Sequence, residues 1–165
     1  MTHQESIINI ISTLLQLPIK QREALFRGNP FSKLINSYHY HTRDGDYLYR
    51  KKLAHQHWRM SVDAYNVFKS GGLYHGKKSV LYGEHRIPVS IIRERLKACD
   101  GSLEQVRKIL DANEVVIITK WEQKRLDSKK SKGGLGLKKD LPEGGGDRLD
   151  FAGILIASET DGHKL

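Results

Sequence analysis

The chain has 165 residues, of which 38% are hydrophobic and 28% charged, with a formal net charge of +9. This length supports one domain core, and a positive charge of this size attracts polyanions such as nucleic acids. The single cysteine, Cys99, excludes an intrachain disulfide and a cysteine-ligated zinc site, and no apolar run reaches the ~20 residues of a membrane helix. With no secretory signal at its start, we expect a reducing, cytoplasmic location and no membrane partner.

The first 72 residues carry a succession of helical signals. Thr2 and Glu5 have the spacing of a capping box, and the apolar residues that follow recur with helical period as far as Pro18. Further helices are predicted over residues 19–27, 31–40 and 47–70, each bounded by glycine, proline or a polar turn. We therefore expect residues 1–72 to form a helical N-terminal portion.

Residues 73–128 show a mixed pattern that indicates an αβ portion. Short β-prone pieces lead to Tyr82, and residues 114–118 are the clearest strand in the chain. Two helical segments, residues 89–98 and 102–110, lie between these strands. After the second strand, Thr119 and Glu122 form another capping box, which predicts a short helix ending near Ser128.

These elements predict an α+β fold in a single domain, residues 1–165. A helical N-terminal portion is followed by a small β-sheet with a helical insertion. Residues 149–157 are largely apolar and predict a terminal strand that docks on this sheet.

Positive charge is concentrated after the second predicted strand. Residues 129–148 form a lysine- and glycine-rich loop with too few apolar side chains for its own core, so we expect a loop that is mobile or ordered by nucleic acid. Cations that neutralise phosphates release counterions, and Trp121 is placed to stack on bases. We predict a nucleic-acid partner, DNA in preference to RNA, contacted by Arg86, Lys120, Lys124, Arg125, Lys129, Lys130, Lys132, Lys138 and Lys139.

A carboxylate and an imidazole stand side by side where the first strand meets a helix, in the run Glu84-His85-Arg86-Ile87-Pro88. Together with the later strand, Thr119 and the polar helix, residues 79–128 resemble the HNH (His-Me finger) nucleases. The resemblance implies that His85 is the general base and Glu84 a metal ligand. It further implies that Gln123 and Asp127, four apart and on one helical face, complete the metal site, with Glu122 as a substitute ligand.

Phosphodiester hydrolysis explains why these residue types belong together. Histidine can activate water near neutral pH, and a cation on the scissile phosphate offsets the charge that develops there. Oxygen ligands favour Mg²⁺ or Mn²⁺. An ordinary structural role also fits these residues, because Glu122 has capping-box spacing and a strand-end histidine is often held by its neighbours.

The leading functional prediction is therefore a metal-dependent HNH-like endonuclease that hydrolyses DNA, in host defence or in a mobile element. Two alternatives stay open: a non-catalytic nucleic-acid-binding or phage-type inhibitor protein, and a metal-free ribonuclease toxin. The sequence leaves the oligomeric state open, including a homodimer.

Overall fold

The computed structural model describes residues 1–49, 54–72 and 78–157. The chain forms two compact units: a helical unit of Met1–Tyr47 and Val89–Asn113, and a sheet unit of Leu48–Pro88 and Glu114–Leu165. Helices and a small antiparallel sheet confirm the predicted α+β class. The division does not follow the predicted single domain with a boundary at residue 72, because the chain enters each unit twice.

Five helices build the helical unit, and their ends follow local sequence signals. In the first helix, both hydrogen bonds of the Thr2–Glu5 capping box are present. Proline precedes or opens the second and third helices, where its fixed φ suits a first turn. The helices are α1 (His3–Leu15), α2 (Ile19–Arg27), α3 (Pro30–Tyr40), α6 (Val89–Ala98) and α7 (Leu103–Asp111).

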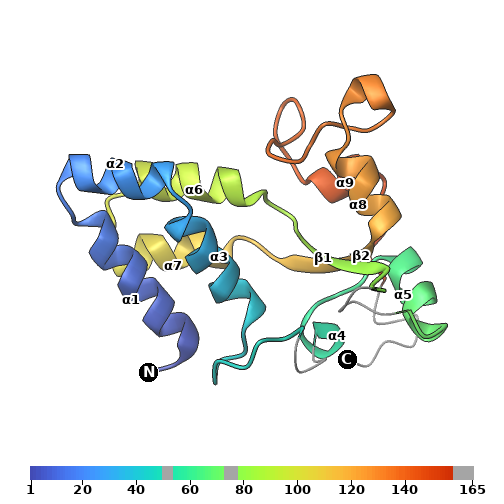
Figure 1. The fold of residues 1–165 in the computed structure, drawn as a ribbon, viewed down its shortest axis with the longest axis horizontal. Coiled ribbons are helices and arrows are strands. Elements are labelled where there is room, and N and C mark those ends of the chain that lie inside the picture. Colours follow the sequence, from blue (N-terminus) through green and yellow to red (C-terminus); the bar gives the residue numbers. More distant parts are fainter. Residues whose placement is uncertain (50–53, 73–77, 158–165) are drawn as a thin grey trace. The chain divides into compact units, whose positions relative to one another are not determined.

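The core of the helical unit forms from apolar pairs spaced one helical turn apart. Helix α1 packs against α3 and α7, and α6 packs against α3 and α7 (Figure 1). The rings of Phe26 and Phe31 stack with centroids 4.1 Å apart where α2 meets α3. The buried pairs are Ile7 and Ile11, Phe31 and Ile35, Ile92 and Leu96, and Val106 and Leu110.

A two-stranded antiparallel sheet lies at the centre of the sheet unit. Strand β1 (Leu81–His85) pairs with β2 (Val115–Thr119), with Leu81 opposite Thr119 and His85 opposite Val115. On the other edge of β2, Met60 forms a parallel bridge with Ile117, and Ser61 then bridges Ile156. The amide and carbonyl of Ile117 are therefore hydrogen-bonded on the edge away from β1, in the middle of a strand whose four apolar residues are buried.

The long helix predicted over residues 47–70 is wrong. The described residues form two short helices instead, α4 (Ala54–His57) and α5 (Val62–Lys69). Between them, the Ile117 amide donates to the Arg59 carbonyl at 2.8 Å, and the Ser61 amide donates to the Ile117 carbonyl at 2.9 Å. Pairing with β2 thus outweighs helix propensity in this segment.

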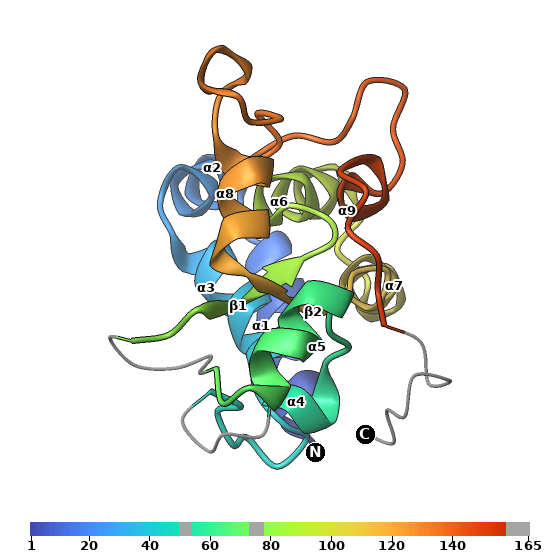
Figure 2. The same cartoon turned by 90° about the vertical axis from the view of Figure 1, so that its right-hand side faces the viewer.

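Helices cover the β1–β2 pair on both sides. In both views, α8 (Lys120–Asp127) and α9 (Arg148–Phe151) lie on one side of the strands and α4 and α5 on the other (Figures 1 and 2). On the α8 side, a core cluster forms from Val116, Ile118, Leu126, Leu137, Leu149, Ala152 and Ile154. On the opposite side, Tyr49 and Trp58 pack directly over Gly83, where a side chain would collide with them.

The segment after α8 differs from the predicted loop and strand. Residues 129–148 do not form a detached loop, because Leu135 and Leu137 donate backbone hydrogen bonds of 2.8 Å to the Arg125 and Leu126 carbonyls, and Leu137 is buried. A short 3₁₀ turn, Lys130–Lys132, lies within this segment. The predicted strand 149–157 is wrong over its first part, which lies in α9; within the described residues it is limited to the bridge at Ile156.

No helix among the described residues is both long and apolar enough to cross a membrane.

Candidate functional site

Glu84 belongs to a buried ion pair. Its Oε1 accepts from Nη2 of Arg148, a side chain of α9 that is only 1% exposed. The same guanidinium donates to the His85 carbonyl through Nη2 at 2.6 Å and through Nε at 3.1 Å, and to the Leu137 carbonyl through Nη1 at 2.9 Å. Arg148 thus joins β1, α9 and the segment after α8. The carboxylate predicted to bind a metal is held by a structural cation.

His85 is buried at the end of β1, but it points away from Glu84. Adjacent strand residues project to opposite faces, so His85 shares the face of Gly83, over which Tyr49 and Trp58 pack. The carbonyl of His85 accepts from Arg148 on the other side. The pair that is adjacent in sequence is therefore divided between two layers of the sheet unit.

Arg86 lies in a second cluster of charges. Its Nη1 is 3.2 Å from a Glu114 oxygen, its Nε pairs with Asp147, and its Nη2 is 3.4 Å from Asp150. Arg59 reaches the same Glu114 in a bidentate contact with both distances at 2.7 Å. These arginines lower the pKa of Glu114, with the hydrogen bond from Arg59 as the largest cause. Arg86, predicted to contact nucleic acid, is already held by three carboxylates.

Glu122 caps two helices at once. Its Oε2 accepts from the Thr119 amide at 2.7 Å and from the Thr119 hydroxyl at 2.9 Å, which completes the capping box of α8. The same oxygen accepts from the Ser61 hydroxyl at 2.9 Å, and that hydroxyl in turn accepts from the Ala64 amide as the N-cap of α5. Because Glu122 is 4% exposed and Ser61 fully buried, this cluster fixes the starts of α5 and α8 together.

Gln123 and Asp127 lie together on one face of α8, as predicted. The Gln123 amide donates to Asp127 at 2.8 Å. Partial burial raises the pKa of Asp127, while Lys138 and this hydrogen bond oppose the shift. The two side chains are therefore joined directly by a hydrogen bond.

The predicted metal ligands do not form one donor set. Within the residues that the structure describes, no three His, Cys, Asp or Glu side chains gather as a metal site. Thr119 lies opposite Leu81, so α8 begins four residues, about 13 Å, along the strand from His85. Glu84 is paired with Arg148, Glu122 caps helices, and Gln123 is bonded to Asp127. As folded, these residues do not fit the metal that the resemblance implies.

Cations and one aromatic ring line the outer face of α8. Lys120 and Lys124 are four residues apart, as are Trp121 and Arg125, so the four side chains share an arc of about 140°. All four are exposed, and Trp121 is 64% exposed. We call these four residues the α8 face. The buried side of the same helix carries Glu122 and Leu126.

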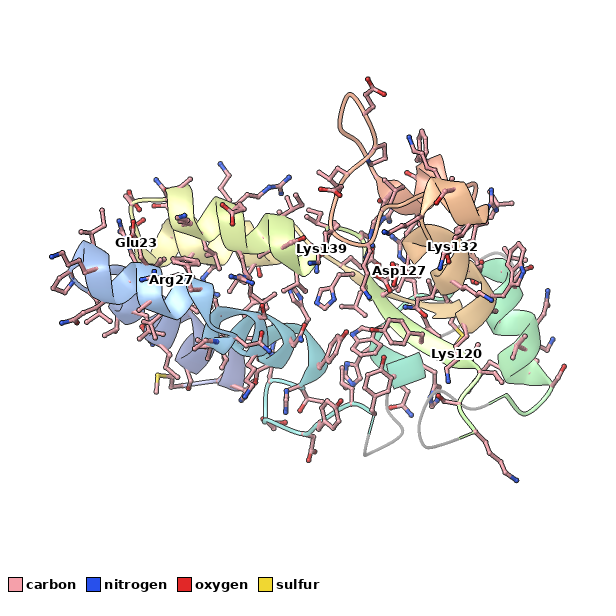
Figure 3. All side chains as sticks on the ribbon, turned by 45° about the horizontal axis from the view of Figure 1, so that its top comes forward. Glu23, Arg27, Lys120, Asp127, Lys132 and Lys139 are labelled. Atoms are coloured by element: carbon pink, nitrogen blue, oxygen red, sulfur yellow. The ribbon has the colours of Figure 1, made fainter. Side chains whose placement is uncertain are left out.

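The predicted lysines beyond α8 are also exposed. Glycine-permitted turns and the hydrogen bonds to α8 hold this segment near the C-terminal end of the helix. Figure 3 shows Lys120 at one end of α8, with Asp127 and Lys132 towards the other, so positive charge extends along the helix and beyond it. The exposed lysines of this segment are Lys129, Lys130, Lys132, Lys138 and Lys139.

The feature that sequence reasoning missed is Arg148. It follows a run of glycines and stands between two acidic residues, Asp147 and Asp150, a composition typical of an exposed turn. No local sequence pattern predicts that its guanidinium is buried beside the carboxylate of Glu84, 64 positions earlier in the chain. Only the fold shows that Glu84 has this partner.

Comparison with protein-family models, curated proteins and solved structures finds no match to this chain.

Proposed function

We propose that the protein binds nucleic acid through the α8 face and the lysine-rich segment that follows it. One observation carries this proposal: exposed cations gather on α8 and on the segment after it, where they outnumber the exposed Asp140 and Glu143. Among the described residues, the ion pairs of the sheet unit are made instead by Arg59, Arg86 and Arg148. The lysines of α8 and of the following segment point to solvent.

The dimensions of the α8 face suit a phosphate backbone. A helix of eight residues is about 12 Å long, a distance over which one strand of a duplex carries three or four phosphates. Three cations on this face, extended by the lysines near its C-terminal end, match that spacing. The attraction is electrostatic and independent of sequence, so it predicts strong dependence on salt.

The test measures binding of labelled oligonucleotides by fluorescence anisotropy between 50 and 300 mM salt. Replacing Lys120, Lys124 and Arg125 with glutamine should lower the slope of log K against log salt by about two to three, close to one per lost phosphate contact. A matched control replaces three exposed lysines of the helical unit, Lys20, Lys97 and Lys108.

The two triple variants carry the same net charge, so the comparison separates the position of the charge from its amount. Equal losses in both variants would refute the α8 face as the binding surface. Absence of binding at low salt would refute the proposed function itself.

Cleavage of nucleic acid is a second candidate, favoured by the order of elements. A strand ending in His85, its antiparallel partner and a helix occur in the order of the HNH resemblance, although α6 and α7 are inserted between the two strands. The test is nicking of plasmid DNA with Mg²⁺, Mn²⁺ or EDTA, with His85→Ala as the comparison. Metal-dependent nicking that disappears in His85→Ala would support an endonuclease, and RNA cleavage in EDTA would support a metal-free ribonuclease. Binding without cleavage in every condition would refute both.

A further inference from the structure

An open cavity of about 540 Å³ adjoins the α8 face within the sheet unit. Asp63, Asn66 and Val67 of α5 form one wall, and the rest of the lining is formed by Val80, Thr119, Lys120 and Trp121. The volume is in the range of sites that take small organic groups. A second cavity shares Asn66, Val67 and Val80, so the hollow continues along α5.

The lining combines apolar surface with a few polar groups at its rim. Val80 and Trp121 are 45% and 64% exposed, so both offer apolar surface at the cavity. The Asn66 amide can both donate and accept hydrogen bonds, and the Asp63 carboxylate accepts them. A flat ring with polar edges satisfies both requirements, because its faces contact apolar atoms while its edge meets the amide and the carboxylate.

The position of the cavity indicates which kind of molecule would supply such a ring. Lys120 lines the cavity and also belongs to the α8 face, and Trp121 reaches from the cavity to the same face as Lys124 and Arg125. A strand whose phosphates follow these cations therefore passes the mouth of the cavity. Aromatic side chains beside a basic groove are the usual stacking platforms for unpaired bases.

We propose that this cavity receives an unpaired base of single-stranded DNA, stacked on Trp121, while the neighbouring phosphates lie on the α8 face. This inference rests on the proposed function and extends it from nucleic acid in general to single strands. In duplex DNA the bases are paired and stacked, so a base can enter the cavity only at the free-energy cost of extruding it from the helix.

Trp121 itself provides the signal for the test. The chain has two tryptophans, and Trp58 is buried at 6% exposure, so the Trp58→Phe variant reports on Trp121 alone. The probes are a single-stranded DNA 12-mer of mixed sequence, the same strand annealed to its complement, an abasic strand with the same number of phosphates, and an RNA strand of the same sequence. The single strand should quench Trp121 fluorescence, whereas the abasic strand should bind without quenching.

Two variants separate stacking from charge. Trp121→Leu should weaken binding of the single strand about tenfold or more and leave the abasic strand unaffected. Lys124→Gln should weaken both strands to a similar extent, since it removes a phosphate contact. Circular dichroism checks that both variants fold, which their exposed positions favour.

The outcomes distinguish this inference from the proposed function beneath it. Salt-dependent binding that is equal for the single and abasic strands, with no effect of Trp121→Leu, overturns the base site and leaves nucleic-acid binding intact. Tighter binding of the duplex without quenching also overturns it, as does quenching by an RNA strand of the same sequence but not by DNA. If no strand binds at low salt, the proposed function fails as well.

Discussion

The ion pair between Glu84 and Arg148 yields the most specific prediction about the role of the predicted catalytic dipeptide. Replacing Glu84 with glutamine keeps the size of the side chain and removes its charge. The guanidinium of Arg148 then remains buried against the His85 and Leu137 carbonyls and loses the negative charge of Glu84. A structural role for Glu84 predicts a large loss of stability in the sheet unit.

The magnitude follows from the burial of both partners. Removing one member of a buried ion pair usually costs 3–5 kcal/mol, and because Glu84 keeps 10% of its side-chain surface exposed we expect about 3 kcal/mol. With a urea dependence of about 2 kcal/mol/M, the unfolding midpoint should fall by about 1.5 M. The paired replacement Glu84→Leu with Arg148→Met removes both charges and should recover most of this loss.

The assay is urea unfolding followed by fluorescence of Trp58, which is buried in the same unit; a Trp121→Phe background removes the second signal. Glu143→Gln is the matched control, since Glu143 is exposed in the sheet unit and should change stability by less than about 0.5 kcal/mol. A midpoint for Glu84→Gln equal to that of Glu143→Gln would refute the structural role. Glu84 would then be available as a ligand.

Three further predictions test other parts of the fold by urea unfolding followed by far-UV circular dichroism, which reports on the helices of both units. Burial lowers the pKa of His39 to about 4, so stability should be full above pH 6.5 and fall by about 3 kcal/mol as the pH drops to 4. His39→Gln should remove this slope, and its persistence would contradict the assignment. Glu122→Gln should destabilise far more than Glu5→Gln, which alters the same capping motif at the partly exposed start of α1. Equal losses would show that α5 gains no stability from Glu122. Gly83→Ala should lower the free energy of unfolding by about 1–3 kcal/mol, because the added methyl group would collide with Tyr49. An unchanged midpoint would show that the Tyr49 side chain moves aside without loss of stability.

Local signals in the sequence were sufficient for most of the helices. The Thr2–Glu5 and Thr119–Glu122 spacings identified the starts of α1 and α8, and in both cases the structure contains the reciprocal hydrogen bonds. The apolar pattern of residues 89–98 matches α6 to the residue. Such signals are reliable because the interactions that produce them lie within one turn of the chain.

Features that depend on distant partners could not be predicted. Residues 58–61 read as helix, but Met60 pairs with Ile117 on the far edge of β2. Glu84 and His85 read as one catalytic pair, because sequence adjacency hides the alternation that sends them to opposite faces of a strand. Arg148, which decides the surroundings of Glu84, is 64 residues away and has no local signature.

The insertion of α6 and α7 between β1 and β2 couples the two units through the chain itself. The pairing of β1 with β2 closes a loop of about 30 residues, and the hydrogen bond from the Arg86 amide to the Glu114 carbonyl closes it at the point where the chain crosses between the units. While α6 and α7 are folded, their ends are held and this loop is short and stiff. If they unfold, the strands must close a flexible loop instead, at an entropic cost of about 2 kcal/mol relative to a tight turn. Melting of the helical unit therefore loosens the sheet by lengthening the connection between its two strands.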